Sequence, residues 1–108
     1  MYRRGRSSAG RHLVLYAFRR EDAAHAGEAR LGVSVSRRVG GAVERNRLKR
    51  VLKERFAEIA ATLPADHDFV VIVRPGAFEY LEEHGSAALG ERLAELSRRL
   101  LGEGANAA

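Results

Sequence analysis

The residues best suited to chemistry in this sequence are the basic side chains of one short stretch, residues 37–55. Eight of its nineteen positions are Arg or Lys, and only two are acidic. Guanidinium and ammonium groups gathered at this density favour a partner that carries many negative charges. We therefore expect this stretch to lie against a polyanion.

The charge of the whole chain is divided in the same sense. Residues 1–55 carry 15 basic and 5 acidic side chains, whereas residues 56–108 carry 4 basic and 9 acidic ones. Segregation of this kind favours a directed electrostatic field toward nucleic acid or an anionic membrane surface. The alternative is a generally Arg-rich protein, which would leave the clustering without a reason.

A helix must position most of these cations. The spacing predicts a helix from Ala42 to Leu63, ended by Pro64, with Gly40-Gly41 before it permitting a positive φ or a close approach. Cations at a helix N-terminus repel the helix dipole, so their number here indicates a bound anion rather than stability. A solvated face would mix in more Glu. The apolar stripe is Leu48, Leu52, Phe56, Ile59 and Leu63. Away from this stripe, basic side chains are grouped around Asn46: Arg45, Arg47, Lys49, Arg50 and Lys53.

Three strands and a second helix complete the expected elements. Strands are predicted at 12–19, 30–36 and 69–74, the first two as antiparallel neighbours and the third covered on both faces because it is continuously apolar. The strand–helix–strand crossover is right-handed by default. Residues 2–11 are expected to form a loop or arm, 20–29 a loop, and 77–84 a short helical or irregular connection. A last helix should run from an N-cap at Ser86 to about Gly102, with residues 103–108 as a frayed tail.

Two of these strands carry candidate ligand-binding faces. On strand 12–19, Tyr16 and Phe18 lie on the face opposite Leu13 and could stack on unpaired bases. The alternative is a core position, which we favour for Phe18, while Tyr16 stays open between the two. On strand 30–36 the small face leaves room for a ligand or backbone to approach; it comprises Gly32, Ser34 and Ser36. The Arg residues of 2–11 either contact phosphates or form a solvated tail.

Several classes of protein are disfavoured. The chain has no Cys, which removes disulfides and thiolate nucleophiles and fits a reducing compartment. No apolar run approaches the ~20 residues of a membrane span, and the N-terminus lacks the apolar block of a signal peptide, so a cytoplasmic location is expected. The histidines are scattered, Asp66 and Asp68 have nothing convergent with them, and no Walker-type loop is present. We expect no catalytic and no metal-binding residue in the chain.

The segment Val39–Arg50 resembles the signature of the protein subunit of bacterial ribonuclease P: a Gly, then Ala-Val, then Arg-Asn with a following Lys-Arg. Segments 12–18, 31–38 and 69–75 also follow in the family's order, so the resemblance covers essentially the whole chain. It implies a single α+β domain over residues 1–108, a two-layer α/β sandwich of the kind found in the second domain of a small-subunit ribosomal protein. Its four-stranded sheet would contain a left-handed βαβ crossover.

The resemblance also implies a function. Proteins of the family bind a catalytic RNA and the 5′ leader of precursor tRNA. The catalytic RNA hydrolyses the phosphodiester bond with Mg²⁺. These ions are held mainly by the RNA, and the protein alone is expected to bind none. It implies no membrane and no obligate protein partner. The alternative is a general RNA-binding or ribosome-associated protein without a role in cleavage. Implied contacts to the catalytic RNA are Arg37, Arg38, Arg45, Asn46, Arg47, Lys49, Arg50 and Lys53; those lining a leader-binding cleft are Tyr2, Tyr16, Phe18, Arg11, Ser34 and Ser36.

The start of the chain departs from the family pattern. The family begins with a basic helix that carries another cleft aromatic and forms one wall of the cleft, and Tyr2 matches the position at the end of that helix. This chain begins at Met1. We expect either a reduced cleft or a start codon placed too far downstream, and we favour the second.

Overall fold

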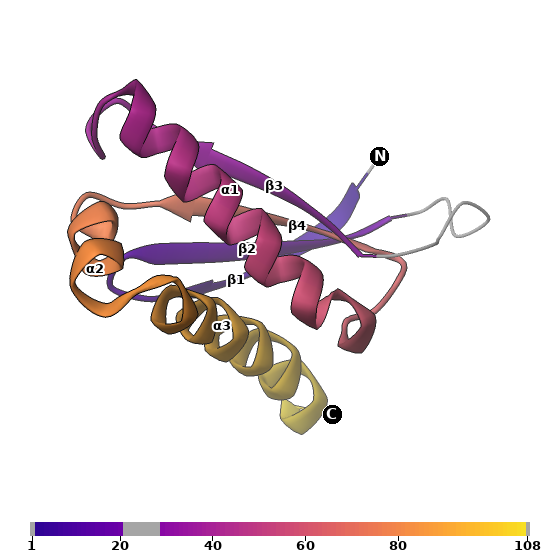
Figure 1. Cartoon of the computed structure of the whole chain (residues 1–108). Coiled ribbons are helices and arrows are strands. Elements are labelled where there is room, and N and C mark those ends of the chain that lie inside the picture. The colour runs from indigo at the N-terminus through magenta and orange to yellow at the C-terminus, as the bar shows by residue number, and fades with distance from the viewer. Residues whose placement is uncertain (1, 21–28, 108) are drawn as a thin grey trace.

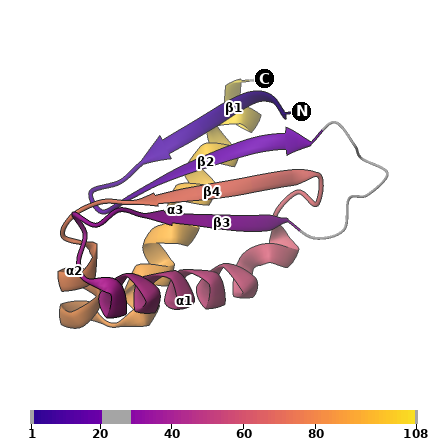
Figure 2. The same ribbon diagram turned by 90° about the horizontal axis from the view of Figure 1, so that it is seen from above.

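Four strands and three helices form two layers (Figure 1). The structure, a computed structural model, describes residues 2–20 and 29–107, with side chains over 5–20 and 29–102. All three helices lie on one side of the sheet, as the view from above shows (Figure 2). In chain order the elements are β1 (Tyr2–Ala9), β2 (Leu13–Arg20), β3 (Arg30–Val35), α1 (Ala42–Ile59), the 3₁₀ turn η2 (Ala60–Thr62), β4 (His67–Val73), α2 (Ala77–His84) and α3 (Ser86–Ala107).

The sheet is mixed, with the strand order β1-β2-β4-β3. β1 and β2 pair antiparallel, as do β2 and β4, whereas β3 runs parallel to β4. The crossover from β3 through α1 to β4 is left-handed (Figure 1), as the family resemblance implies and against the default rule. The expectation that the first two strong strands are neighbours is wrong, because β4 lies between β2 and β3.

The core lies between the sheet and the helices. Leu13, Leu15 and Ala17 alternate along β2 toward the helices and are almost fully buried, as the period of two predicts. Helix α1 packs against β3, and α3 packs against β1 and β2, so the two helices divide the covered face between them. On α3 the predicted stripe of Leu89, Leu93, Leu96 and Leu100 is buried. For α1, Leu48, Leu52 and Phe56 are buried as predicted, together with Val51, which was not predicted, whereas Ile59 and Leu63 are only partly buried.

Two strand predictions need correction. Residues 2–11 do not form a loop or arm, because Tyr2–Ala9 pair with β2 as an edge strand through backbone hydrogen bonds. β4 is not covered on both faces: Phe69, Val71 and Val73 are buried, but Ile72 on the opposite face is 36% exposed. One whole face of the sheet therefore carries no helix among the described residues.

The helix ends differ from expectation in small ways. α1 begins at Ala42 as predicted, and its last turn narrows into η2 before Pro64. Ser86 is the first residue of α3 rather than its cap, and its hydroxyl accepts a hydrogen bond from Arg55 at 2.7 Å. α3 continues to Ala107, beyond the predicted end at Gly102 and through most of the expected frayed tail. Residues 77–84 form α2, and the predicted loop falls almost entirely on residues 21–28, outside the described part.

Candidate nucleic-acid interface

The outer face of α1 presents the exposed cations. Asn46, Arg50 and Lys53 are all exposed and point away from the buried side of the helix, as its periodicity predicts. Arg37 and Arg38 are exposed in the turn that leads from β3 to α1. Turn and helix together form one basic surface, which we call the α1 basic face: Arg37, Arg38, Arg45, Asn46, Arg47, Lys49, Arg50 and Lys53.

The N-terminus of α1 is capped by the side chain of Glu44. Its carboxylate accepts a hydrogen bond from the backbone N–H of Gly41 at 3.0 Å. A Cβ on Gly40 would collide with the same side chain, so Gly40 provides the close approach that the sequence allows. Gly41 has φ of −74°, and the described glycines with positive φ are Gly76 and Gly85, so the positive-φ alternative does not apply at this turn.

Two arginines of the α1 basic face differ in how the protein holds them. The guanidinium of Arg47 donates to the Glu82 carboxylate at 2.7 Å and lies 5.8 Å from the centre of the Phe78 ring, which ties α1 to α2. Both partners in this ion pair are about half exposed, so the pair is weak and a phosphate could replace the carboxylate. Arg45 is half-buried, and its Nε has no hydrogen-bond partner among the described residues.

The helix-free face of the sheet carries the two aromatic side chains of β2, Tyr16 and Phe18. Tyr16 is 37% exposed and lies between Ser7 of β1 and Val70 of β4 in the strand register. Its ring is nearly parallel to that of Phe18, at 7° with centroids 6.4 Å apart. We call this surface the open face; its described members include Ser7, Val14, Tyr16, Phe18, Val70, Ile72 and Ser34.

Phe18 belongs to this face and not to the core, contrary to the preferred reading of its sequence position. It pairs with Gly5 across the β1–β2 ladder, and a Cβ on Gly5 would stand 2.6 Å from the Phe18 ring. Only glycine leaves room for the ring at that point. The ring therefore lies flat over the edge strand, half-buried and beside Tyr16.

The other predicted cleft residues are distributed unevenly. Ser34 lies on the open face opposite Ile72, and Ser36 is exposed just past the end of β3. Arg11 lies elsewhere, in the turn between β1 and β2, where it lines a pocket with α2 and α3. The resemblance implies that Tyr2 ends a helix, but Tyr2 begins β1 and its backbone pairs with Arg20 of β2. The side chain of Tyr2 lies outside the described part.

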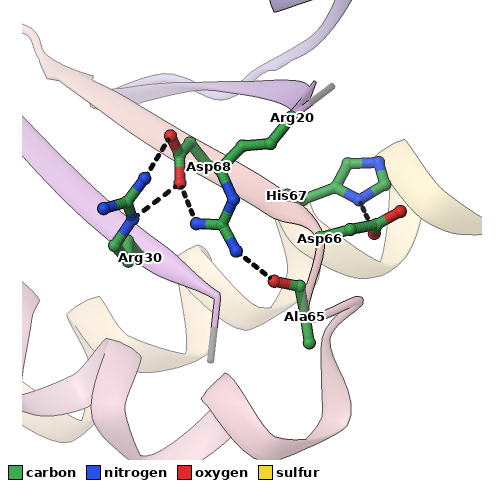
Figure 3. Close-up of polar contacts among 6 residues, drawn as sticks. All are labelled: Arg20, Arg30, Ala65, Asp66, His67 and Asp68. Carbon is green, nitrogen blue, oxygen red and sulfur yellow. Dashed lines mark hydrogen bonds and ion pairs between the residues drawn. The ribbon is translucent and has the colours of Figure 1, made fainter. Parts of the chain in front are cut away.

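A buried ion cluster at one end of the open face was not anticipated (Figure 3). The Asp68 carboxylate accepts hydrogen bonds from Arg20 at 2.7 Å and from Arg30 at 3.0 and 3.1 Å. The side chains of Arg20 and Asp68 are only 10% and 12% exposed. The expectation that nothing converges on Asp68 is therefore wrong. Its carboxylate links β4 to β2 through Arg20 and to β3 through Arg30.

Asp66, two residues before Asp68, pairs with His67 instead of the two arginines of this cluster. The hydrogen bond from His67 Nδ1, at 2.8 Å from Asp66 Oδ1, lowers the pKa of the Asp66 carboxyl. In the described ranges 2–20 and 29–107, no three His, Asp or Glu side chains are grouped so as to hold a metal ion. No helix there is long and apolar enough to cross a membrane.

Fold and site together define a small α+β sandwich protein with a basic helix and an open aromatic sheet face. The chain belongs to the ribonuclease P family, whose model matches residues 1–100. Among curated proteins, it is 38% identical over 77 residues to the ribonuclease P protein component of Listeria innocua and 41% identical over 76 residues to that of Brevibacillus brevis. The alignments cover 71% and 70% of this chain but only 62% and 58% of those relatives.

Solved structures agree with the fold. The chain is similar to the RNase P protein from Thermotoga maritima in complex with 1-(4-fluorophenyl)-2-thiourea, with a TM-score of 0.76 and 30% identity. That match covers 88% of this chain and 85% of the other. A Staphylococcus aureus RNase P protein matches with a TM-score of 0.60 and 29% identity, over 86% and 84% of the two chains. The α+β fold with its four-stranded mixed sheet is therefore that of bacterial RNase P proteins.

Proposed function

We propose that this chain is the protein subunit of a ribonuclease P ribonucleoprotein, which binds a catalytic RNA and the 5′ leader of precursor tRNA and so promotes maturation of the tRNA 5′ end. The observation that supports this most is the pairing of two surfaces on one small domain. The α1 basic face suits a phosphate backbone, and the open face offers parallel rings to unpaired bases.

The α1 basic face is the proposed contact for the catalytic RNA. Arg50 and Lys53 are exposed and have no acidic partner among the described residues, so they are available to phosphates, whereas Arg47 pairs with Glu82. Asn46 lies among them and can both donate and accept hydrogen bonds. Contacts of this kind neutralise phosphates, release counterions and make the affinity depend strongly on salt.

The open face is the proposed site of the leader. A single strand exposes its bases, and the rings of Tyr16 and Phe18 lie parallel at the spacing of alternate residues on a strand, where bases can stack. Ser34 lies farther across the same face and leaves room for a backbone. The chemistry is tolerant of sequence, which suits a subunit that must accept many leaders.

The RNA is proposed to perform the hydrolysis, with Mg²⁺ held mainly by the RNA. The candidate side chains of the protein are cationic, amide and aromatic, and these are not the carboxylates on which Mg²⁺ sites are built. The protein would instead lower the repulsion between two RNAs near the cleavage point. We place this particle in the cytoplasm and expect it to need no other protein.

Reconstitution tests the proposal. The purified protein is added to a bacterial ribonuclease P RNA and a precursor tRNA at low Mg²⁺, and 5′ cleavage is followed with time. We expect faster cleavage with the protein than without it, and no cleavage by the protein alone. RNA binding without any enhancement would instead favour the general RNA-binding alternative, and cleavage by the protein alone would refute a catalytic role for the RNA.

A matched pair of variants makes the test specific. Arg50→Ala removes an exposed cation from the α1 basic face, whereas Arg98→Ala removes an equally exposed cation from α3. Both leave the buried side of their helix intact. The enhancement should fall with the first and persist with the second; equal losses would show that general positive charge, and not this face, is responsible.

A further inference from the structure

A pocket of about 700 Å³ opens at the end of the domain where the β1–β2 turn meets α2 and α3. Arg11 and His12 come from the turn, Tyr80 and His84 from α2, and Arg92 and Arg99 from α3. This volume is within the range of small-ligand sites, about 300–1,000 Å³. The pocket shares none of its lining residues with the α1 basic face or with the named residues of the open face.

Three neighbouring rings line the pocket, and we call them the aromatic row. The ring of Tyr80 contacts those of His12 and His84, with centroids 5.0 Å and 4.5 Å away and the planes tilted by 37° and 38°. Arg92 donates a hydrogen bond to the Tyr80 hydroxyl at 3.1 Å and lies 5.8 Å from the centre of its ring. Tyr80 is therefore held in place before any ligand arrives.

Gly76 allows the backbone to pass close to the His12 ring. Gly76 has φ of 97°, a left-handed conformation that side chains rarely adopt, and a Cβ there would stand 3.2 Å from the His12 ring. His12 thus contacts both the bare backbone of Gly76 and the ring of Tyr80. His84 is the exposed ring of the three, on which an incoming planar group can stack.

The polar groups around the rings match one base better than the others. Glu79 and Glu83 place exposed carboxylates at the pocket, and Arg11 and Arg99 place exposed guanidiniums there. Guanine offers N–H donors on its Watson–Crick edge and the acceptors O6 and N7 on its other edge, so it can use both kinds of group. We propose that this pocket binds an unpaired guanine nucleotide, stacked on the aromatic row.

Helix α2 connects this pocket to the proposed RNA surface. Phe78 and Glu82 contact Arg47 of the α1 basic face, while Tyr80 and His84 of the same helix line the pocket. An RNA strand leaving the N-terminal end of α1 would need to cross only one helix to reach it. The bound guanine can therefore belong to an RNA strand or to a free nucleotide, and the experiment must separate these sources.

Nuclear magnetic resonance of the full chain tests the pocket without any catalytic RNA, so its outcome is independent of whether cleavage is enhanced. GMP, AMP, CMP and UMP are titrated separately, followed by single-stranded RNA oligonucleotides with and without one guanine in a uridine background. The backbone amides of Gly10 and Gly76 line the pocket and report binding there. We expect GMP, and more strongly the guanine-containing oligonucleotide, to shift both signals.

Variants at exposed positions keep the test interpretable. His84→Ala and Arg99→Ala should weaken guanine binding about five-fold or more, the loss expected when one stacking or charged contact is removed. Arg98→Ala, one position along α3 and outside this pocket, should leave binding unchanged. If only the oligonucleotide binds, the ligand is an RNA strand; if GMP binds equally well, a free nucleotide suffices.

The proposal is overturned if the amide shifts occur only on α1 or on the open face, or if all four nucleotides bind alike. It is equally overturned if both His84→Ala and Arg99→Ala bind guanine as the parent chain does.

Discussion

Replacing Tyr16 by Ala is the sharpest test of the open face. Tyr16 is 37% exposed and alternates along β2 with the buried residues Leu15 and Ala17, so it contributes little to the core. Its removal should instead delete one stacking platform for an unpaired base. A contact of this kind contributes about 1–3 kcal/mol, which corresponds to an increase in Kd of roughly 5- to 150-fold. Because Phe18 lies parallel beside it and remains, we expect the lower part of that range.

The assay compares two RNAs. Binding of the complex of protein and catalytic RNA is measured by fluorescence anisotropy, at one salt concentration, with precursor tRNA that carries a leader and with mature tRNA that has none. The Kd for the precursor should rise and that for mature tRNA should stay the same. Equal losses for both would mean that Tyr16 supports the fold and does not contact the leader.

Two further variants control for the side-chain change. Tyr16→Phe keeps the ring and should bind leader nearly as well as the parent. Ile72→Ala removes a side chain of nearly the same exposure, 36%, from the same face but takes away no stacking surface. If Ile72→Ala weakens leader binding as much as Tyr16→Ala does, contact area alone explains the effect and the stacking argument fails.

Three more outcomes are expected. Arg50→Ala should reduce the slope of log affinity for the catalytic RNA against log salt by about one ion; an unchanged slope in a salt titration would exclude a phosphate contact. Asp68→Asn should lower the free energy of unfolding by about 3 kcal/mol, because Arg20 stays buried without its carboxylate, and urea denaturation would show no change if the cluster were unimportant. Burial, and then the charge of Arg11, lower the pKa of His12 below 6.5, so the unfolded chain takes up this proton first as pH falls. The free energy of unfolding should therefore decrease as the pH falls through about 6.5 and below, and less so in His12→Asn; identical pH profiles would contradict the assignment.

The sequence predicts best what depends on local periodicity. The start of α1 at Ala42, its buried side and its exposed cations all follow from a repeat of 3.6 residues within one segment. The inward face of β2, from Leu13 to Ala17, follows from a repeat of two. In each case the residues that decide the outcome are near neighbours in the chain.

What the sequence predicts poorly depends on pairing between distant segments. β1 is rich in Arg, Ser and Gly, and its pairing with β2 uses backbone groups that composition does not reveal. The Asp68 cluster needs β2, β3 and β4 in one register before its two arginines meet. His12 and His84 look scattered along the chain, yet both of their rings contact the ring of Tyr80.

The error about β4 has the same origin and is the most informative. A run of apolar residues such as 69–73 predicts a strand buried on both faces, but no pattern distinguishes a face covered by protein from one reserved for a ligand. Val70 and Ile72 belong to the open face. In the strand register, Val70 lies opposite Tyr16 and Ile72 lies opposite Val14, so apolar residues of β4 border the aromatic ones of β2.

The strand order explains how one small domain can serve two RNAs. Because β4 lies between β2 and β3, β3 becomes the edge strand, and its end leads directly through Arg37 and Arg38 into α1. Had β3 been the neighbour of β2, the basic turn would have left from the middle of the sheet. The edge strand thus carries Ser34 of the open face and is followed by Arg37 and Arg38 of the α1 basic face. A leader lying across Tyr16 toward the end of β3 would therefore approach the proposed contact for the catalytic RNA.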